Sequence, residues 1–349
     1  MSEHDAVEHV PEAPSPHPSR RSVLRAGLFA LSASQLPDGL VARAFAQGAK
    51  PAPNLVGKLE GAEVVTDPAR YPKQFREAPQ LAELVKAAKL PPVQERIGQD
   101  PLVVKPLREI GKYGGTWRRG FTGPFDTSNG HRAAQNDKLL YFDYTGTKLV
   151  PNIARGWDVS TDGKVITLQL RRGMRWSDGH PFTADDFVFW FEDVYSNKEL
   201  VPTPLSVMTI NGKPIAVRKV DASTVQLVAP DPYYALPVVL ASVWGIGHHA
   251  RYGRDALGGF APAHYLKAFH PKYASKDDIA KKQADLKFDT WVLLFKNRND
   301  ACRNPDLPVV TPWKTVSPIN TATWVLERNP TASGSTPTAT SCPTSTGSG

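Results

Sequence analysis

The chain has 349 residues, of which 41% are hydrophobic and 22% charged, and a formal net charge of +8. This composition is that of a globular protein, and the length allows two domains or one large domain with extensions. The basic residues are scattered, and no apolar run reaches the ~18 residues that a membrane-spanning helix needs, so neither a nucleic-acid-binding surface nor a membrane span is expected.

Residues 1–46 are typical of a twin-arginine export signal. The pair Arg20 and Arg21 precedes a moderately apolar stretch, and a small-x-small cleavage site ends at Ala46, before Gln47. A chance arginine pair in an amphipathic helix is the alternative, but three features in this order favour the signal. We therefore expect the twin-arginine translocase to export the folded chain to the periplasm.

Residues 47–112 are rich in proline and are interpreted as an extension that wraps around the following domain. Within them, apolar residues recur three and four apart over residues 78–90, which predicts an amphipathic helix. The pair Pro91 and Pro92 is expected to end this helix.

From residue 113 the pattern changes to short strands separated by turns. The pair Asp162 and Gly163 lies between two strand-like segments, and Asp-Gly in this position predicts a tight hairpin. The predicted strands cover residues 114–121, 139–142, 157–160, 164–170, 215–221 and 224–228.

Two helices are predicted among these strands. Thr183 is suited to cap the first helix, and the acidic residues that follow it favour a helix N-terminus. The apolar face of this helix, which we expect to be core, consists of Phe187, Trp190, Phe191, Val194 and Tyr195. A second helix over residues 232–242 is expected to be interrupted or kinked at Pro237. Strands and helices without strict alternation favour an α/β or α+β lobe.

Four motifs at characteristic spacing connect this region to a known family. They are VPNIARGW at residues 150–157, STDG at 160–163, LRRGMRWSDG at 170–179 and PFTADDFV at 181–188. Together they closely resemble the extracellular solute-binding proteins of family 5, the oligopeptide, dipeptide and nickel receptor group. Weaker similarity extends from Gly114 to Pro330, and the resemblance implies that residues 324–330 are a strand of the main lobe.

The resemblance implies an α/β fold of the type II periplasmic-binding class, in which two lobes close around a ligand. Residues 113–330 correspond to the N-terminal part of the solute-binding domain, so the lobe is expected to be incomplete, without the second lobe and the return segment. The implied function is the periplasmic substrate-binding component of an ABC importer for peptide-like solutes, with a membrane permease as partner. Neither catalysis nor a cofactor is expected.

The resemblance also suggests where a ligand would lie. In this family the first strand of the lobe runs along the cleft. The corresponding residues of this chain are Phe121, Thr122 and Phe125. Backbone groups of this strand are expected to pair with an extended ligand. Trp244 is a second candidate aromatic residue of the cleft. An ordinary core position is the alternative for each of the four.

Residues 331–349 differ in composition from everything before them. They contain six Thr, five Ser and three Gly, and no charged or large apolar residue. A low-complexity linker or glycosylated tail is one interpretation. GC-rich codons for this segment, read one base out of frame, can encode an aromatic cluster followed by a strand, so a frameshift is the interpretation that we favour.

Other functions have less support in the sequence. An exported enzyme would need a catalytic motif, and neither the Gly-x-Ser-x-Gly nor the His-Glu-x-x-His pattern is present. His248 and His249 suggest a metal, but no nearby Cys or carboxylate completes a ligand set. The interpretation as a surface protein of unrelated function is supported by the Ser/Thr-rich tail alone. Whether Cys302 and Cys342 form a disulfide stays open, as does the identity of the ligand.

Overall fold

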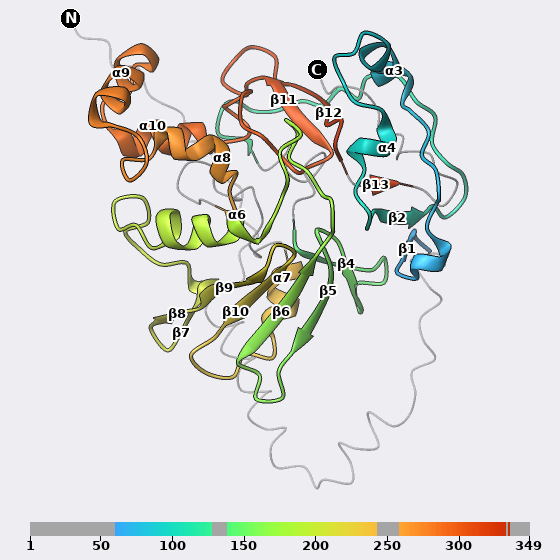
Figure 1. Ribbon diagram of the computed structural model, residues 1–349, viewed down its shortest axis with the longest axis horizontal. Coiled ribbons are helices and arrows are strands. Elements are labelled where there is room, and N and C mark those ends of the chain that lie inside the picture. The colour runs from blue at the N-terminus through green and yellow to red at the C-terminus, as the bar shows by residue number, and fades with distance from the viewer. Residues whose placement is uncertain (1–59, 128–137, 243–257, 333, 336–349) are drawn as a thin grey trace, which may run out of the picture. The chain divides into compact units, whose positions relative to one another are not determined.

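A computed structural model of the chain describes residues 60–127, 138–242, 258–332 and 334–335 (Figure 1). The described residues belong to one compact unit. The predicted export signal of residues 1–46 lies outside the described residues. Within the described ranges, no helix combines the length and the apolar character that crossing a bilayer requires.

The central element is a four-stranded antiparallel sheet in the order β5-β6-β10-β9. Its strands are β5 (Ala154–Val159), β6 (Val165–Leu170), β9 (Ala216–Asp221) and β10 (Thr224–Val228). The predicted hairpin is confirmed, because Gly163 takes a φ of +68° and Asp162 accepts a hydrogen bond from the Lys164 backbone nitrogen at 3.1 Å. The side chains of β6 alternate as expected, with Ile166 and Leu168 fully buried.

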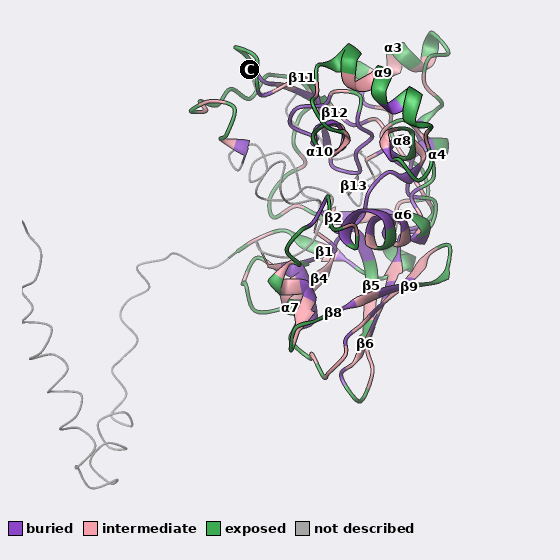
Figure 2. Cartoon of the chain, turned by 90° about the vertical axis from the view of Figure 1, so that its left-hand side faces the viewer, coloured by how far each residue is buried: buried purple, intermediate pink, exposed green. Residues whose placement is uncertain are grey.

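Helix α6 (Ala184–Phe189) packs against this sheet and continues as the π-helical segment η3 (Trp190–Tyr195). Thr183 caps α6 as predicted, in a capping box with Asp186. Figure 2 shows α6 largely in the colour of buried residues. The aromatic face predicted to be core is confirmed, because all its members are buried except Phe191, which packs on the core while partly exposed.

Helix α7 (Leu236–Ala241) packs against the hairpin of β3 (Leu140–Phe142) and β4 (Leu149–Pro151). The expected kink at Pro237 is wrong. This residue lies in the first turn of α7, where a backbone N–H has no partner within the helix, so the helix loses no hydrogen bond.

The strand predicted over residues 114–121 is also wrong. This segment belongs to none of the strand ladders among the described residues, although it is followed by a well-formed turn. Gly114 and Gly115 have φ values of +108° and +79°. Such left-handed backbone is incompatible with a continuous strand, so the glycine pair bends the chain instead of starting a strand.

The N-terminal segment of the unit combines short helices with a small sheet. Its elements are β1 (Glu63–Val65), η2 (Pro68–Arg70), α3 (Pro79–Lys86), α4 (Val93–Arg96) and β2 (Leu102–Lys105). The predicted helix is confirmed as α3, but it ends at Lys86, before the proline pair. Ala88 has a φ of +54° and its backbone nitrogen bonds to the Val85 carbonyl, which closes the helix four residues earlier than expected.

Buried arginine side chains attach this segment to the rest of the unit. Arg96 is 3% exposed, pairs with Glu77 and donates to the Pro330 carbonyl. Arg171 donates to the carbonyls of Asn152 and Pro101. Burial lowers the pKa of the Arg171 guanidinium to about 10. The segment is therefore integrated into the domain by charge-assisted hydrogen bonds.

The first residues of the predicted tail belong to this region as well. Strand β13 (Gly334–Ser335) pairs in parallel with β2, so the small sheet has the order β1-β2-β13. Thr331 is buried, and its hydroxyl donates to the Trp176 carbonyl at 3.0 Å. Residue 333 and residues 336–349 lie outside the described part of the chain.

The remaining elements lie on the opposite side of α6 from the four-stranded sheet (Figure 1). They are α8 (Ala263–Leu266), η6 (Lys267–Phe269), α9 (Lys276–Leu286), α10 (Trp291–Arg298), β11 (Trp313–Ser317) and β12 (Val325–Arg328). The strand predicted over residues 324–330 is confirmed as β12, which pairs with β11. A 3-10 turn, η4 (Ser206–Met208), and the short hairpin of β7 (Thr209–Ile210) and β8 (Lys213–Pro214) precede β9.

Apolar side chains gather in two buried clusters. The larger cluster lies between the four-stranded sheet, α6 and the helices beyond it. The smaller cluster, which we call the hairpin cluster, surrounds β11 and β12 and consists of Cys302, Trp313, Ile319, Trp324 and Leu326. Mixed helices and antiparallel strands around these clusters confirm the α/β class expected from the sequence.

Candidate functional site

Three of the four predicted ligand residues lie in one short loop, residues 121–127, which we call the 121–127 loop. Gly123 has a φ of +130°, and the Asp126 backbone nitrogen donates to the Gly123 carbonyl at 2.9 Å. The Asp126 carboxylate accepts a hydrogen bond from the Thr122 backbone nitrogen at 3.1 Å. These contacts close the loop on itself and restrict its backbone.

Two contacts from distant parts of the chain hold this loop in place. The Arg303 guanidinium donates to the Pro124 carbonyl at 2.7 Å and also forms a buried ion pair with Asp300. The Phe121 ring meets Trp324 of the hairpin cluster edge to face, with centroids 6.4 Å apart. The loop is therefore positioned by groups whose own side chains are buried.

The loop directs its side chains in different directions. Phe121 is partly buried against the hairpin cluster, so it serves mainly as packing. Thr122 is exposed, and its hydroxyl lies 3.4 Å from Asp126. Phe125 is 94% exposed. A large aromatic side chain so exposed on a fixed loop is the strongest candidate here for contact with another molecule.

The predicted pairing of the loop backbone with an extended ligand is less favourable than expected. The Thr122 N–H and the carbonyls of Gly123 and Pro124 already take part in hydrogen bonds within the protein. A ligand strand would have to share or displace these partners. Recognition at this loop is therefore more favourable through the Phe125 side chain than through strand addition.

Several predicted functional residues lie outside the described residues. They are Trp244, the histidine pair His248 and His249, the signal residues Arg20 and Arg21, and the cleavage residues Ala46 and Gln47. Cys302 is buried in the hairpin cluster, whereas Cys342 is not described, so their pairing stays untested. Among the described residues, no group of three or more His, Cys, Asp or Glu side chains is arranged to hold a metal.

Sequence reasoning missed the residues that position the loop. Arg303 lies 179 positions from Pro124, and no local pattern connects the two. Asp126 was missed as well, although an aspartate after a Gly-Pro turn is a common partner for nearby backbone N–H groups. Trp324 was part of the segment predicted as a strand, but its contact with Phe121 could not be foreseen.

Comparison with known proteins identifies the family. Residues 148–337 match the family model described as "Bacterial extracellular solute-binding proteins, family 5 Middle". The chain is 29% identical over 279 residues to the periplasmic alpha-galactoside-binding protein of Rhizobium meliloti (strain 1021), which is 74% of this chain and 36% of that protein. It is 35% identical over 103 residues to di/tripeptide-binding protein 1 of Pseudomonas aeruginosa (strain UCBPP-PA14), which is 26% of this chain and 19% of that protein.

Two solved structures share the fold over most of this chain. An oligopeptide-binding protein OppA is 36% identical, with a TM-score of 0.70 over 79% of this chain and 41% of the other. The periplasmic binding protein MelB of Agrobacterium fabrum C58, in complex with stachyose, is 25% identical, with a TM-score of 0.60 over 82% of this chain and 41% of the other. This chain thus spans less than half the length of the relatives that it matches. The matched family region covers more than half of the chain, which belongs to the bacterial extracellular solute-binding proteins of family 5.

Proposed function

We propose that the chain is the solute-binding component of an ABC importer for peptide-like solutes and acts in the periplasm. The observation that carries this proposal is the 36% identity to an oligopeptide-binding protein over 79% of the chain. Relatives named as peptide-binding proteins support the ligand class, and the periplasmic protein of R. meliloti supports the location. The partners are a membrane permease and, for export, the twin-arginine translocase. The proposal assigns no catalysis to the chain.

In this proposal the 121–127 loop contributes one side of the ligand site. Phe125 provides an exposed aromatic face that loses water-accessible area when an apolar or amphipathic ligand covers it. Arg303 and Trp324 act as positioning residues, because they hold the loop and do not themselves reach the solvent-exposed side. Prior ordering of the loop lowers the entropy cost of binding.

Oligosaccharides are the second candidate ligand class. They are favoured by the alpha-galactoside-binding relative, which matches 74% of this chain against 26% for di/tripeptide-binding protein 1, and by the stachyose complex of MelB. An aromatic side chain such as Phe125 suits either class, because both sugar rings and peptide side chains present apolar surface. The loop alone therefore does not separate the two classes.

A ligand-observed NMR titration of the full chain with tri-alanine and with stachyose separates the candidates. Because the chain spans 41% of the length of OppA, contacts made by the rest of such a protein are outside it, and we expect weak, roughly millimolar binding. Saturable transfer of magnetisation from the protein to tri-alanine is the expected result. Transfer to stachyose alone would assign oligosaccharides, instead of peptides, as the ligand class. Transfer to neither compound would contradict solute binding by this chain.

The low-complexity segment after Pro330 is part of the same proposal. We propose that residues 331–349 are encoded out of frame, because their composition changes abruptly next to a family motif. Resequencing the gene across the codons for Asn329 and Pro330 tests this directly. We expect one missing or extra base, whose correction opens a reading frame that encodes an aromatic cluster. An unchanged sequence from an independent isolate would contradict the frameshift.

A further inference from the structure

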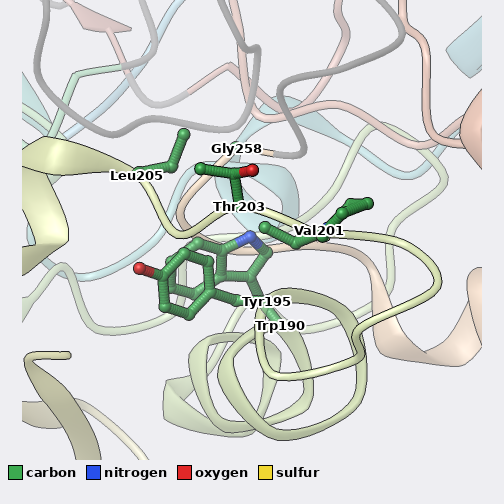
Figure 3. Close-up of a pocket in the computed structure, with 7 residues that line it drawn as sticks. Trp190, Tyr195, Val201, Thr203, Leu205 and Gly258 are labelled. Carbon is green, nitrogen blue, oxygen red and sulfur yellow. The ribbon is translucent and has the colours of Figure 1, made fainter. Parts of the chain in front are cut away.

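A cavity of about 260 Å³ lies beside η3, away from the 121–127 loop. It borders the larger core cluster, whereas the 121–127 loop packs on the hairpin cluster. Figure 3 shows the residues that line it, and the labelled ones are Trp190, Tyr195, Val201, Thr203, Leu205 and Gly258. Most of these side chains are apolar, so the cavity favours an apolar occupant over water.

The π-helical geometry of η3 brings two aromatic rings of the cavity together. Trp190 and Tyr195 are five residues apart, which in a regular α-helix would place them about 140° apart around the axis. In η3 their rings stack, with centroids 5.1 Å apart and planes at 22°. π-Helical turns are rare and occur frequently at functional sites, where they redirect side chains. The distortion of this helix therefore coincides with the wall of the cavity.

The Tyr195 hydroxyl supplies a polar group in this apolar setting. It is buried at the Leu205 end of the cavity (Figure 3), near the Leu205 backbone and the Thr209 side chain, without a well-formed hydrogen bond to either. The Leu205 carbonyl already accepts a hydrogen bond from the Thr209 hydroxyl at 2.9 Å. Burial raises the pKa of Tyr195, so the hydroxyl keeps its proton at neutral pH and is available as a donor. A buried hydroxyl without a good partner is unfavourable, and a ligand acceptor would relieve this.

We propose that this cavity binds a small, mostly apolar molecule that carries one hydrogen-bond acceptor and has about the size of a substituted phenol. The volume is below the ~300 Å³ at which typical small-molecule pockets begin, and larger than the ~150 Å³ cavity that accommodates benzene in another protein. Tyr195 donates to the acceptor, and Trp190, Val201 and Leu205 surround the apolar part. The site is additional to the solute site proposed at the 121–127 loop.

Two probe molecules of similar shape test the site on the full chain. In 4-methylphenol a hydroxyl replaces one methyl group of 1,4-dimethylbenzene, so the pair isolates the hydrogen bond from the apolar contact. Calorimetric or NMR titrations are made with the wild type, Tyr195→Phe and Leu205→Trp. The control is Tyr234→Phe, because the Tyr234 hydroxyl donates to the Thr161 carbonyl outside the cavity. Thermal unfolding verifies that each variant is folded.

The wild type is expected to bind 4-methylphenol more tightly than 1,4-dimethylbenzene. Tyr195→Phe should weaken the binding of 4-methylphenol about tenfold, which is the effect of one lost hydrogen bond. The affinity for 1,4-dimethylbenzene should stay nearly unchanged. Leu205→Trp fills the cavity and should abolish binding of both, while Tyr234→Phe changes neither. Absence of saturable binding to the wild type would overturn the proposal, as would equal binding of 4-methylphenol to the wild type and Tyr195→Phe.

Discussion

Arginine side chains connect segments that are far apart in the sequence of this protein. Arg303 joins the 121–127 loop to the turn that contains Asp300, and Arg96 joins the N-terminal segment to Pro330. The guanidinium group suits this task, because it donates several hydrogen bonds in a fixed plane and stays charged when buried. At the scale of single residues, these contacts explain how short elements keep their positions.

The pair of Arg303 and Asp300 is expected to contribute strongly to stability. Both side chains are less than 10% exposed, so Arg303→Ala leaves a buried carboxylate without its cation. We expect the free energy of unfolding to fall by about 3 kcal/mol in urea denaturation. Asp306→Asn is the matched control, because Asp306 is 76% exposed and lies 3.7 Å from Arg298, and its loss should cost under about 0.5 kcal/mol. Equal effects of the two changes would contradict this account.

Asp100 predicts a dependence of stability on pH. The Arg172 side chain donates two hydrogen bonds to this carboxyl and, against the opposing effect of burial, holds its pKa below the usual value. A carboxyl with a lowered pKa in the folded state stabilises the fold above its unfolded pKa, near 4, and loses this contribution as pH falls through the folded pKa. Asp100→Asn should therefore lower the free energy of unfolding by about 1 kcal/mol at neutral pH.

The same comparison at acidic pH completes the test of Asp100. Once the pH lies below the lowered folded-state pKa of Asp100, both forms carry a neutral side chain at this position, so the difference between wild type and Asp100→Asn should shrink toward zero. Denaturant unfolding of both proteins across this pH range gives the difference. A difference that is constant with pH would show that the Arg172 pairing is not its source.

At the scale of elements, local sequence signals were reliable where they act within a few residues. The Asp162-Gly163 hairpin and the helix cap at Thr183 form as predicted, because their hydrogen bonds join neighbours in sequence. The segment 114–121 was predicted wrongly, since a strand depends on a partner that the local pattern does not reveal. The contact of Arg303 with Pro124 was unpredictable for the same reason.

The cap of α6 gives a prediction for this element. Thr183 accepts a hydrogen bond from the Asp185 backbone nitrogen at 3.3 Å, and Asp186 reaches back to the Thr183 nitrogen at 3.0 Å. Thr183→Ala should lower the free energy of unfolding by about 1 kcal/mol. Thr183→Ser keeps the hydroxyl and serves as the control, with most of the stability retained. A loss in Thr183→Ser as large as in Thr183→Ala would place the effect in the methyl group instead of the cap.

At the scale of the whole molecule, the sequence motifs gave the family and the fold class, but not the arrangement of the site. The large apolar residues of the motifs at 150–188 lie in the core of the unit, where Trp176 and Phe187 are fully buried. These residues serve folding more than ligand contact. The proposed solute site depends on surface side chains such as Phe125, whose exposure follows from how distant segments pack, and this is not encoded in any short motif.

The proposed export signal gives a prediction for the location of the chain. Arg20→Lys combined with Arg21→Lys should leave most of the protein in the cytoplasm, because the twin-arginine route depends on this pair. Cell fractionation followed by immunoblotting measures the distribution. Arg25→Lys is the control and should be exported like the wild type. Export of the double variant at the wild-type level would contradict a twin-arginine signal.

The most direct test of the proposed solute site is the effect of Phe125→Ala on ligand binding. Phe125 is 94% exposed and Val220, on β9, is 56% exposed, so Val220→Ala removes apolar surface of another region as a matched control. Ligand-observed NMR titrations with tri-alanine are made on the wild type and both variants. If the 121–127 loop contacts the solute, Phe125→Ala should weaken binding about tenfold without changing the thermal unfolding, and Val220→Ala should bind like the wild type. Unchanged affinity in Phe125→Ala would contradict the assignment of this loop to the solute site.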